Sequence, residues 1–321
     1  GLPWLRSFVT GGLVLLLMSA CAQGPDYDLV IRGGTLYDGS GEPGMVGDLA
    51  ISGDTIVAMG DLSEASGAQE IDASGMAVAP GFVNLMSWAT ETMIADGRAM
   101  SDILQGVTLQ VLGEGTSMGP IPDSLKDWAE SEQGEIKYEI DWTTLGEYLE
   151  YLVDRGVSPN VSSFMGAATA RTNVLGFEDR APNGDELAQM QELVREAMRE
   201  GALGLASALI YAPGAYAQTP ELMALAEAAG EFGGIYISHL RSEGNQLLEA
   251  FEEFMTIART AEVPAEIYHL KAAGEENWAK MDEVIRRVEA ARAEGLRITA
   301  DMYTYTAGAT GLDAAMPPWA Q

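Results

Sequence analysis

The chain has 321 residues, of which 47% are hydrophobic and 37 are glycines, so it is long and apolar enough to bury a large core of the α/β type. It carries 48 acidic and 18 basic residues, which give a formal net charge of −30. An electrostatic field of that sign repels nucleic acid and anionic membrane surfaces, so the composition excludes both as partners.

Residues 1–21 form a targeting segment rather than part of the fold. Arg6 precedes an apolar run from Leu13 to Met18, and two small residues separate this run from Cys21, the only cysteine. A charged start, a short apolar stretch and small residues before a cleavage site predict a secretory signal, and the run is too short to span a bilayer. The segment resembles a bacterial lipobox, so Cys21 is either lipidated or part of an ordinary secretion signal. Both alternatives predict an exported protein. It would be either periplasmic or anchored to the outer membrane, with a lipid at Cys21 as its only attachment to the membrane.

Residues 22–79 predict a small β domain. Short alternating stretches begin near Asp28, Asp48 and Thr55, and turn signals such as Ser52-Gly53-Asp54 separate them.

Strands and helices then alternate over residues 80–321, which predicts a parallel sheet. Seven β/α units in about 240 residues favour a (β/α)₈ TIM-type barrel, with an open doubly wound sheet as the alternative. The predicted strands lie at 77–85, 108–112, 161–165, 204–209, 235–238, 265–268 and 297–300, and the clearest helices at 185–200, 221–232, 243–261 and 278–294.

An eighth strand and helix do not follow in this sequence. A barrel of seven strands cannot close, so we expect this piece alone to be inactive and to aggregate through its unpaired edges. The glycine-rich segment from Gly113 to Gly119 opens no helix pattern directly, and we interpret it as an active-site loop.

The two histidines of the chain, His239 and His269, each close a short apolar run of strand type. The segment between them carries apolar residues at helical spacing. Such a strand–helix–strand unit has the length of a parallel crossover, which places both imidazoles side by side at the carboxyl ends of neighbouring strands. The pattern therefore predicts a metal site.

Longer blocks of sequence resemble a known family. Tyr27-Asp-Leu-Val-Ile-Arg-Gly-Gly and Ala79-Pro-Gly-Phe-Val-Asn resemble the opening of the amidohydrolase superfamily. Later blocks, which include Ser238-His-Leu-Arg-Ser-Glu-Gly, His269-Leu-Lys-Ala-Ala-Gly and Asp301-Met-Tyr-Thr-Tyr-Thr-Ala-Gly, are similar to the N-acyl-D-amino-acid deacylases, or D-aminoacylases. The resemblance implies a metal-dependent (β/α)₈ barrel beside a small β-sandwich. It also implies zinc at the strand ends, a zinc-activated water that attacks the amide of an N-acyl-D-amino acid, and a late aspartate as general base.

The sequence departs from the family at several metal ligands. The first strand, usually ending in His-x-His, reads Met86-Ser87-Trp88, and we expect Met86 and Trp88 to fill the lost metal position with apolar bulk. The second strand, usually ending in a ligating cysteine, reads Gly113-Glu114-Gly115-Thr116, with the carboxylate one place before the expected thiolate. The third reads Gly166-Ala167-Ala168 in place of Gly-His-Gly, and the catalytic aspartate would lie beyond Gln321.

The ligands that remain predict one zinc ion per chain. Zinc needs a third protein ligand beside His239 and His269, and an open position for water. Glu114 is the predicted third ligand; the alternative is a loop carboxylate that hydrogen-bonds the glycine-rich turn. A site of two imidazoles and one carboxylate would draw the pKa of its water toward neutrality.

Four further residues are predicted to bind substrate. Arg241 and Lys271 each lie two residues past a histidine and could bind a carboxylate or an amide oxygen; the alternative is an ion pair with Glu243 or Glu275. Asp301 and Tyr303 resemble residues of the family that line the pocket, and Tyr303 could donate a hydrogen bond to the oxyanion. Arg171 is a weaker candidate for the same role.

Two functions follow as hypotheses. The first is zinc-dependent hydrolysis of N-acyl-D-amino acids or related D-residue amides. The second is a non-catalytic protein that binds acylated amino acids or cell-wall fragments, because three histidines of the family pattern are replaced.

Overall fold

The computed structural model describes residues 24–317 and residue 320, so the predicted signal segment and Cys21 lie outside the described residues. The chain divides into two compact units, Gly1–Pro80 and Gly81–Gln321. None of the helices among the described residues has both the length and the apolarity that crossing a membrane requires.

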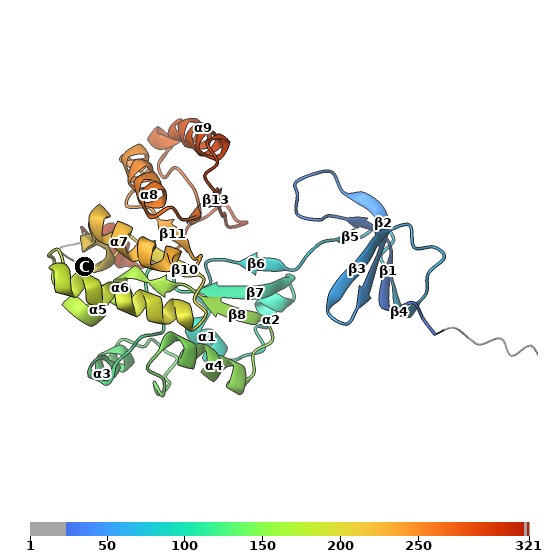
Figure 1. Cartoon of the computed structure of the whole chain (residues 1–321), viewed down its shortest axis with the longest axis horizontal. Helices are drawn as coiled ribbons and strands as arrows, with labels where there is room; N and C mark the ends of the chain where they lie inside the picture. The colour runs from blue at the N-terminus through green and yellow to red at the C-terminus, as the bar shows by residue number, and fades with distance from the viewer. Residues whose placement is uncertain (1–23, 318–319, 321) are drawn as a thin grey trace, which may run out of the picture. The chain divides into compact units, whose positions relative to one another are not determined.

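The N-terminal unit is a single sheet built around one long central strand (Figure 1). The strand β1 pairs antiparallel with β2, and parallel with β4 and β5. Gly53, in the left-handed region at φ 61°, turns the chain between β2 and β3. The β-sandwich implied by the family is not observed, because the described residues of this unit form one sheet. Its strands are β1 (Tyr27–Leu36), β2 (Met45–Ser52), β3 (Thr55–Gly60), β4 (Gly67–Asp72) and β5 (Ala77–Val78).

The second unit contains parallel strands in chain order. One sheet has the order β6-β7-β8 and the other has the order β13-β12-β11-β10-β9. The strands are β6 (Phe82–Asn84), β7 (Val107–Leu112), β8 (Asn160–Ser163), β9 (Met165–Gly166), β10 (Gly204–Ala208), β11 (Ile235–His239), β12 (Ala265–Ile267) and β13 (Ile298–Ala300).

The two sheets meet at Phe164, which lies between β8 and β9. Its amide donates a hydrogen bond to the carbonyl of Leu112 at 2.9 Å, and the Ser163 carbonyl accepts one from Leu203 at 3.0 Å. The predicted third strand is therefore divided, with β8 paired to β7 and β9 paired to β10. The predicted first strand is divided too, because Ala77–Val78 pairs with β1 and Phe82–Asn84 with β7. The parallel α/β architecture is confirmed, whereas closure is not observed: no described residue of β13 pairs with β6.

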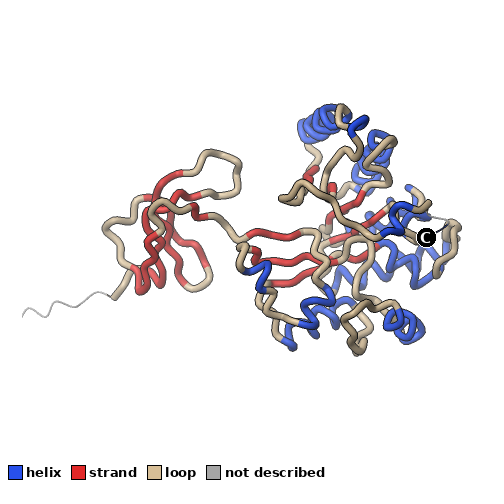
Figure 2. Tube along the Cα trace, turned by 180° about the vertical axis from the view of Figure 1, so that it is seen from behind, coloured by secondary structure: helices blue, strands red, loops and turns tan. Residues whose placement is uncertain are grey.

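Helices lie outside the strands of this unit (Figure 2). The helices α5, α6, α7 and α8 pack side by side in chain order. The bounds are α1 (Thr90–Ala95), α2 (Met100–Ile103), α3 (Asp123–Ser131), α4 (Leu145–Arg155), α5 (Ala167–Leu175), α6 (Gly184–Arg199), α7 (Thr219–Gly230), α8 (Leu247–Ala261) and α9 (Lys280–Ala293), with short 3₁₀ turns at Gly214–Tyr216, Glu275–Asn277 and Leu312–Ala315.

The sequence explains where these helices begin and which face they bury. Asn183 caps α6, and Glu186 returns the bond in a capping box. In α8 the predicted apolar face is buried at Phe251, Phe254 and Met255. The four helices predicted from periodicity are confirmed as α6, α7, α8 and α9, with ends that shift by up to a few residues.

Two apolar clusters form around the parallel strands. The larger one joins the helices to the strands, and it includes the buried Phe251 and Phe254 of α8. The smaller one combines side chains from or next to five successive strands: Val111, Phe164, Ala206, Ile237 and Tyr268. The carboxyl ends of the strands lie beyond this smaller cluster, and three of them carry the candidate site.

Candidate metal centre

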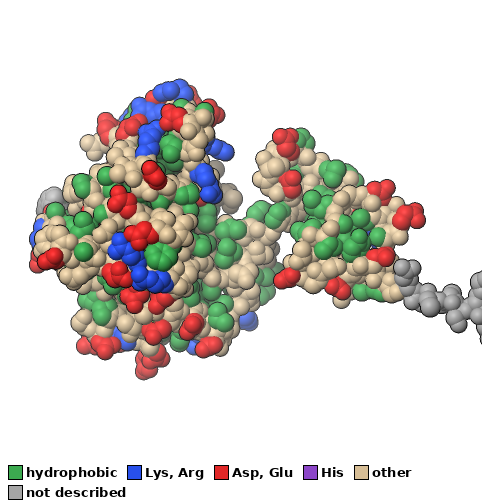
Figure 3. All heavy atoms as spheres, in the orientation of Figure 1, with side chains coloured by type: hydrophobic (Ala, Val, Ile, Leu, Met, Phe, Trp, Pro, Cys, Tyr) green, Lys and Arg blue, Asp and Glu red, His purple; other side chains and the backbone are tan. Residues whose placement is uncertain are grey.

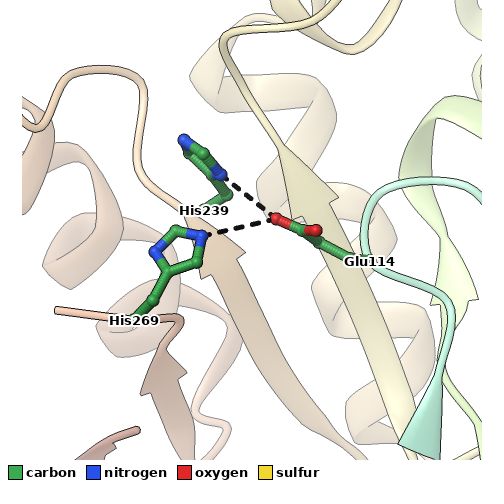
Figure 4. Close-up of side chains that lie close together, drawn as sticks. All are labelled: Glu114, His239 and His269. Carbon is green, nitrogen blue, oxygen red and sulfur yellow. Dashed lines mark hydrogen bonds and ion pairs between the residues drawn. The ribbon is translucent and has the colours of Figure 1, made fainter. Parts of the chain in front are cut away.

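Glu114, His239 and His269 converge at the carboxyl ends of three strands. Glu114 follows β7, His239 is the last residue of β11, and His269 follows β12. The three side chains are buried, and one ligand atom from each lies within 4.8 Å of the others. Figure 4 shows both imidazoles directed at the carboxylate. The structure therefore brings together the three residues that the sequence predicts as ligands.

The position of Glu114 depends on the glycine on each side of it. Gly113 and Gly115 have φ angles of +96° and +70°, which side chains rarely adopt. A Cβ atom on Gly113 would lie 2.4 Å from the Phe164 carbonyl oxygen, and one on Gly115 would lie 2.6 Å from the Cβ of Ala208. The glycines let the loop pass close to the neighbouring strands, so that Glu114 is presented at the strand ends.

His269 is held in an unusual backbone conformation. Its φ of 35° lies in the left-handed region, which costs about 1–3 kcal/mol for a residue with a side chain. The backbone amide of His269 donates a hydrogen bond to Oδ1 of Asp301, which follows β13. The prediction that Asp301 binds substrate is not supported, because Asp301 does not line the pocket described below and instead fixes the backbone of a candidate ligand.

The interatomic distances fit a shared metal ion. Oε1 of Glu114 lies 3.1 Å from Nδ1 of His239 and 3.6 Å from Nε2 of His269. Two ligand atoms on one tetrahedral zinc ion, each about 2.1 Å from it, are about 3.4 Å apart. Two imidazoles and one carboxylate match the ligands that zinc accepts, and they leave one position open.

The charges of the site also favour a cation. Burial by itself raises the pKa of Glu114, but hydrogen bonds and attraction from His239 and His269 outweigh it and lower the pKa to about 2. Burial lowers the pKa of His269, but its contacts with Glu114 and Glu243 outweigh this effect and raise the pKa to about 9. Glu114 is thus ionised at neutral pH. Without a metal ion, a proton on His269 compensates the negative charge of the buried carboxylates, and a bound cation would take over that role.

Trp88 contacts the carboxylate on the side away from the histidines. Its Nε1 donates a hydrogen bond of 2.8 Å to Oε2 of Glu114, although the residue as a whole is 64% exposed. Trp88 thus does more than add the expected apolar bulk, since its Nε1 donates a hydrogen bond to a candidate ligand. Met86 lines the same pocket with its apolar side chain.

Glu243 supports His269 and was missed as a site residue. Its Oε1 lies 2.9 Å from Nδ1 of His269 and accepts a hydrogen bond of 2.6 Å from the Lys271 ammonium. A carboxylate behind a ligating histidine fixes the orientation and the tautomer of the ring. The sequence signal, an acidic residue four positions after His239, indicated only a salt bridge.

Lys271 and Tyr303, two of the four predicted substrate-binding residues, both line the pocket. The Lys271 ammonium contacts Glu243, Nδ1 of His269 and the His269 carbonyl, and it lies 5.5 Å from the centre of the Tyr303 ring. The predicted ion pair with Glu243 therefore forms while Lys271 stays within the pocket.

Arg241 is directed away from the site, against the prediction that it binds substrate. Its guanidinium pairs with Glu253 at 2.8 Å and donates to the carbonyls of Ala215 and Ala217. It holds the turn that follows β10 and is not among the residues that line the pocket. Arg171 is buried in an ion pair of 2.7 Å with Glu221 and does not reach the pocket either.

The candidate ligands open into a cavity of about 670 Å³. Its walls are largely aromatic and aliphatic, and Tyr303 and Tyr305 stack with ring centres 4.7 Å apart. The lining residues are Met86, Trp88, Glu114, Ile210, Tyr211, His239, Glu243, His269, Lys271, Tyr303, Tyr305, Gly308, Ala309, Thr310 and Gly311. The arrangement can place a small molecule against the three ligand atoms.

Comparison with known proteins identifies relatives of this chain, although no family model matches it. A D-aminoacylase of Alcaligenes xylosoxydans xylosoxydans is 35% identical over 291 residues, which are 89% of this chain and 59% of that protein. Among solved structures, a D-aminoacylase described by one-metal activation and second-metal attenuation has a TM-score of 0.76 at 32% identity, covering 87% of this chain and 59% of that one. An N-acyl-D-glutamate deacylase from Bordetella bronchiseptica, complexed with zinc and a phosphonate inhibitor, has a TM-score of 0.76 at 30% identity, with the same coverage of 87% and 59%.

The chain thus spans 59% of the length of the D-aminoacylase from Alcaligenes, while the match extends over 89% of its own residues. Both the sequence and the arrangement of strands and helices agree with these proteins. Over 89% of its residues the chain is therefore homologous to the D-aminoacylases, the N-acyl-D-amino-acid deacylases among the amidohydrolases.

Proposed function

We propose that this protein hydrolyses the amide bond of N-acyl-D-amino acids or related D-residue amides, with one zinc ion held by His239, His269 and Glu114. The observation that carries the proposal is the convergence of these three buried side chains at the mouth of a cavity. When bound, zinc supplies a Lewis acid and activates water as a nucleophile at neutral pH. The names of the relatives support the substrate class, and the zinc complex of the Bordetella deacylase supports the choice of metal.

The residues around the ligands have separate roles in this proposal. Trp88 and Glu243 orient Glu114 and His269. Burial, followed by repulsion from Glu243, raises the pKa of Tyr303, so its phenol remains a hydrogen-bond donor at neutral pH. A donor that faces the pocket can stabilise the oxyanion that forms as the amide carbonyl is attacked. We assign no general base among the described residues.

The test uses zinc-loaded protein and pairs of enantiomers. N-acetyl-D-methionine and N-acetyl-L-methionine are compared as substrates, together with zinc content, in the wild type and in the variants His239→Ala and His269→Ala. We expect hydrolysis of the D-enantiomer, one zinc per chain, and loss of both in the two variants. A matched control is Glu192→Gln, which alters an exposed ion pair far along the sequence from the candidate ligands.

A non-catalytic binding protein is the second candidate function. The observation that favours it is the tryptophan at the first strand, where the family pattern has a histidine. If the protein binds one zinc and N-acyl-D-amino acids, but does not hydrolyse any of several such compounds, this alternative replaces the first.

We also propose that the protein is exported, because residues 1–21 have the pattern of a secretory signal that ends at Cys21. Cell fractionation would show it in the periplasm or in the outer membrane. Retention in the membrane fraction that is lost on Cys21→Ser would support the lipid anchor, and recovery of the protein only from the cytoplasm would overturn export.

A further inference from the structure

Trp88 follows β6 and Glu114 follows β7, and contacts between these two segments hold the two side chains next to each other. The amide of Ser87 donates a hydrogen bond of 2.9 Å to the carbonyl of Val111 on β7. Earlier on the same segment, the Asn84 side chain donates to the Gln110 side chain at 3.1 Å. These contacts hold the segment that follows β6 against β7, three residues before Glu114. The indole is therefore brought to the carboxylate by the backbone, even though much of its ring is exposed.

The two carboxylate oxygens of Glu114 have different partners. Oε2 accepts the indole hydrogen bond of 2.8 Å, and Oε1 lies near both imidazoles. An indole nitrogen is only a donor, so it can orient a carboxylate but cannot bind a metal ion. In the common bridging mode a carboxylate offers one oxygen to each of two metal ions. With Oε2 engaged by Trp88, Glu114 is left to bind one ion through Oε1.

No further histidine, cysteine or carboxylate joins the three candidate ligands among the described residues. Met86 and Trp88 line the same pocket. We propose that Trp88 is a positioning residue that fixes Glu114 as a one-oxygen ligand and limits the centre to one metal ion. This inference rests on the metal site of the proposed function, but not on its catalytic step.

The experiment measures zinc binding directly, by competition with a chromogenic chelator and by metal content after gel filtration. Trp88→Phe keeps an aromatic ring and removes the donor, and we expect it to weaken zinc binding about 10- to 100-fold, as the loss of a partner of a metal ligand does. Trp278→Phe is the control, since Trp278 is also 64% exposed and does not line the pocket. It should bind zinc as the wild type does.

Trp88→His tests the limit to one ion. This variant replaces the donor by a side chain that can ligate zinc, and we expect a second, weaker zinc per chain to appear. Thermal unfolding of the zinc-free variants should match that of the wild type, which separates positioning from a general loss of structure.

Unchanged zinc affinity in Trp88→Phe would overturn the positioning role of Trp88. A single zinc in Trp88→His would overturn the claim that the indole excludes a second ion. If the wild type binds no zinc, this inference and the proposed function both fail. If it binds one zinc tightly but hydrolyses no N-acyl-D-amino acid, only the proposed function fails.

Discussion

Among the three candidate ligands, His269 is the one whose own backbone is strained. Its left-handed conformation is stabilised by the hydrogen bond from its amide to Asp301, whose second oxygen is buried and has no partner in the protein. Asp301 therefore contacts the candidate metal centre through the main chain of His269 and does not line the pocket itself. Its importance would not be suspected from the pocket lining alone.

We predict that Asp301→Ala lowers the free energy of unfolding by about 1–3 kcal/mol, because the His269 amide loses a buried acceptor. Zinc affinity should fall as well, since the His269 ring is no longer held in place. Asp301→Asn keeps an oxygen at the same position and should retain most of both properties. Chemical denaturation and zinc titration measure the two effects, and an alanine variant with wild-type values in both would contradict the prediction.

At the same scale, the sequence predicts the ligands better than their partners. The two histidines and Glu114 could be found because each follows a strand-like run, and parallel strands bring such ends together. Trp88 and Glu243 could not be assigned their roles, because these depend on which oxygen or ring nitrogen each atom faces. Arg241 shows the converse: its spacing from His239 matches that of Lys271 from His269, yet Glu253 turns its guanidinium away.

At the scale of helices, a buried ion pair joins α5 to α7. The side chains of Arg171 and Glu221 are 0% and 3% exposed, and Arg171 also donates to the carbonyls of Glu178 and Arg180. Burial raises the pKa of Glu221 even though Arg171 counteracts this effect. The cost of taking both charges out of water is thus large, and neither residue tolerates the loss of the other.

We predict that Arg171→Met alone lowers the free energy of unfolding by about 3–5 kcal/mol, because Glu221 is left as an unpaired buried charge. The double variant Arg171→Met, Glu221→Leu should recover much of this loss, since no charge remains buried. Urea denaturation of the two single variants and the double variant gives the coupling free energy. A double variant less stable than either single variant would show that the pair is not the source of the effect.

Helix α5 also shows why some elements escape prediction from sequence. Six of its nine residues are buried, among them Ala167, Ala168 and Ala170, so it lacks the polar face on which helical periodicity depends. The break at Phe164 escapes prediction for a different reason. The strand-like segment at 161–165 gives no sign that its first half pairs with one strand and its second half with another.

At the scale of the whole molecule, acidic side chains outnumber basic ones over the visible face (Figure 3), in line with the net charge of −30. Repulsion among these charges opposes the folded state, because folding brings them closer together. Exposed ion pairs such as Arg180 with Glu186 offset little of this repulsion, since each contributes about 0–1 kcal/mol to the stability of the folded state.

We predict that sodium chloride stabilises the protein. Raising it from about 0.1 M to about 1 M shortens the screening length from about 10 Å to about 3 Å, and we expect this to weaken the repulsion within the net charge of −30 more than the attraction within the ion pairs. The midpoint of thermal unfolding should therefore rise, and potassium chloride should have the same effect. A midpoint that falls with both salts would mean that surface ion pairs outweigh the net charge.

The architecture of the whole molecule is predicted from sequence only in part. The order of parallel strands follows from alternation, but closure of a (β/α)₈ barrel requires an eighth strand between the seventh and the first, and no described strand takes that place. The outer edges of β6 and β13 have no partner among the described residues. The expectation that this chain aggregates through such edges stays a prediction, and light scattering of the purified chain would test it.

The glycines beside Glu114 also limit how this centre can evolve. In the family pattern the ligand is a thiolate at the next position, which is Gly115 here. A cysteine at that position would place its Cβ 2.6 Å from the Ala208 side chain and 3.0 Å from the Ala208 nitrogen, on a backbone with φ of +70°. The exchange of one ligand for the other therefore needs a compensating change near Ala208, and either step taken alone is harmful. We therefore expect the residues at positions 115 and 208 to change together among related sequences.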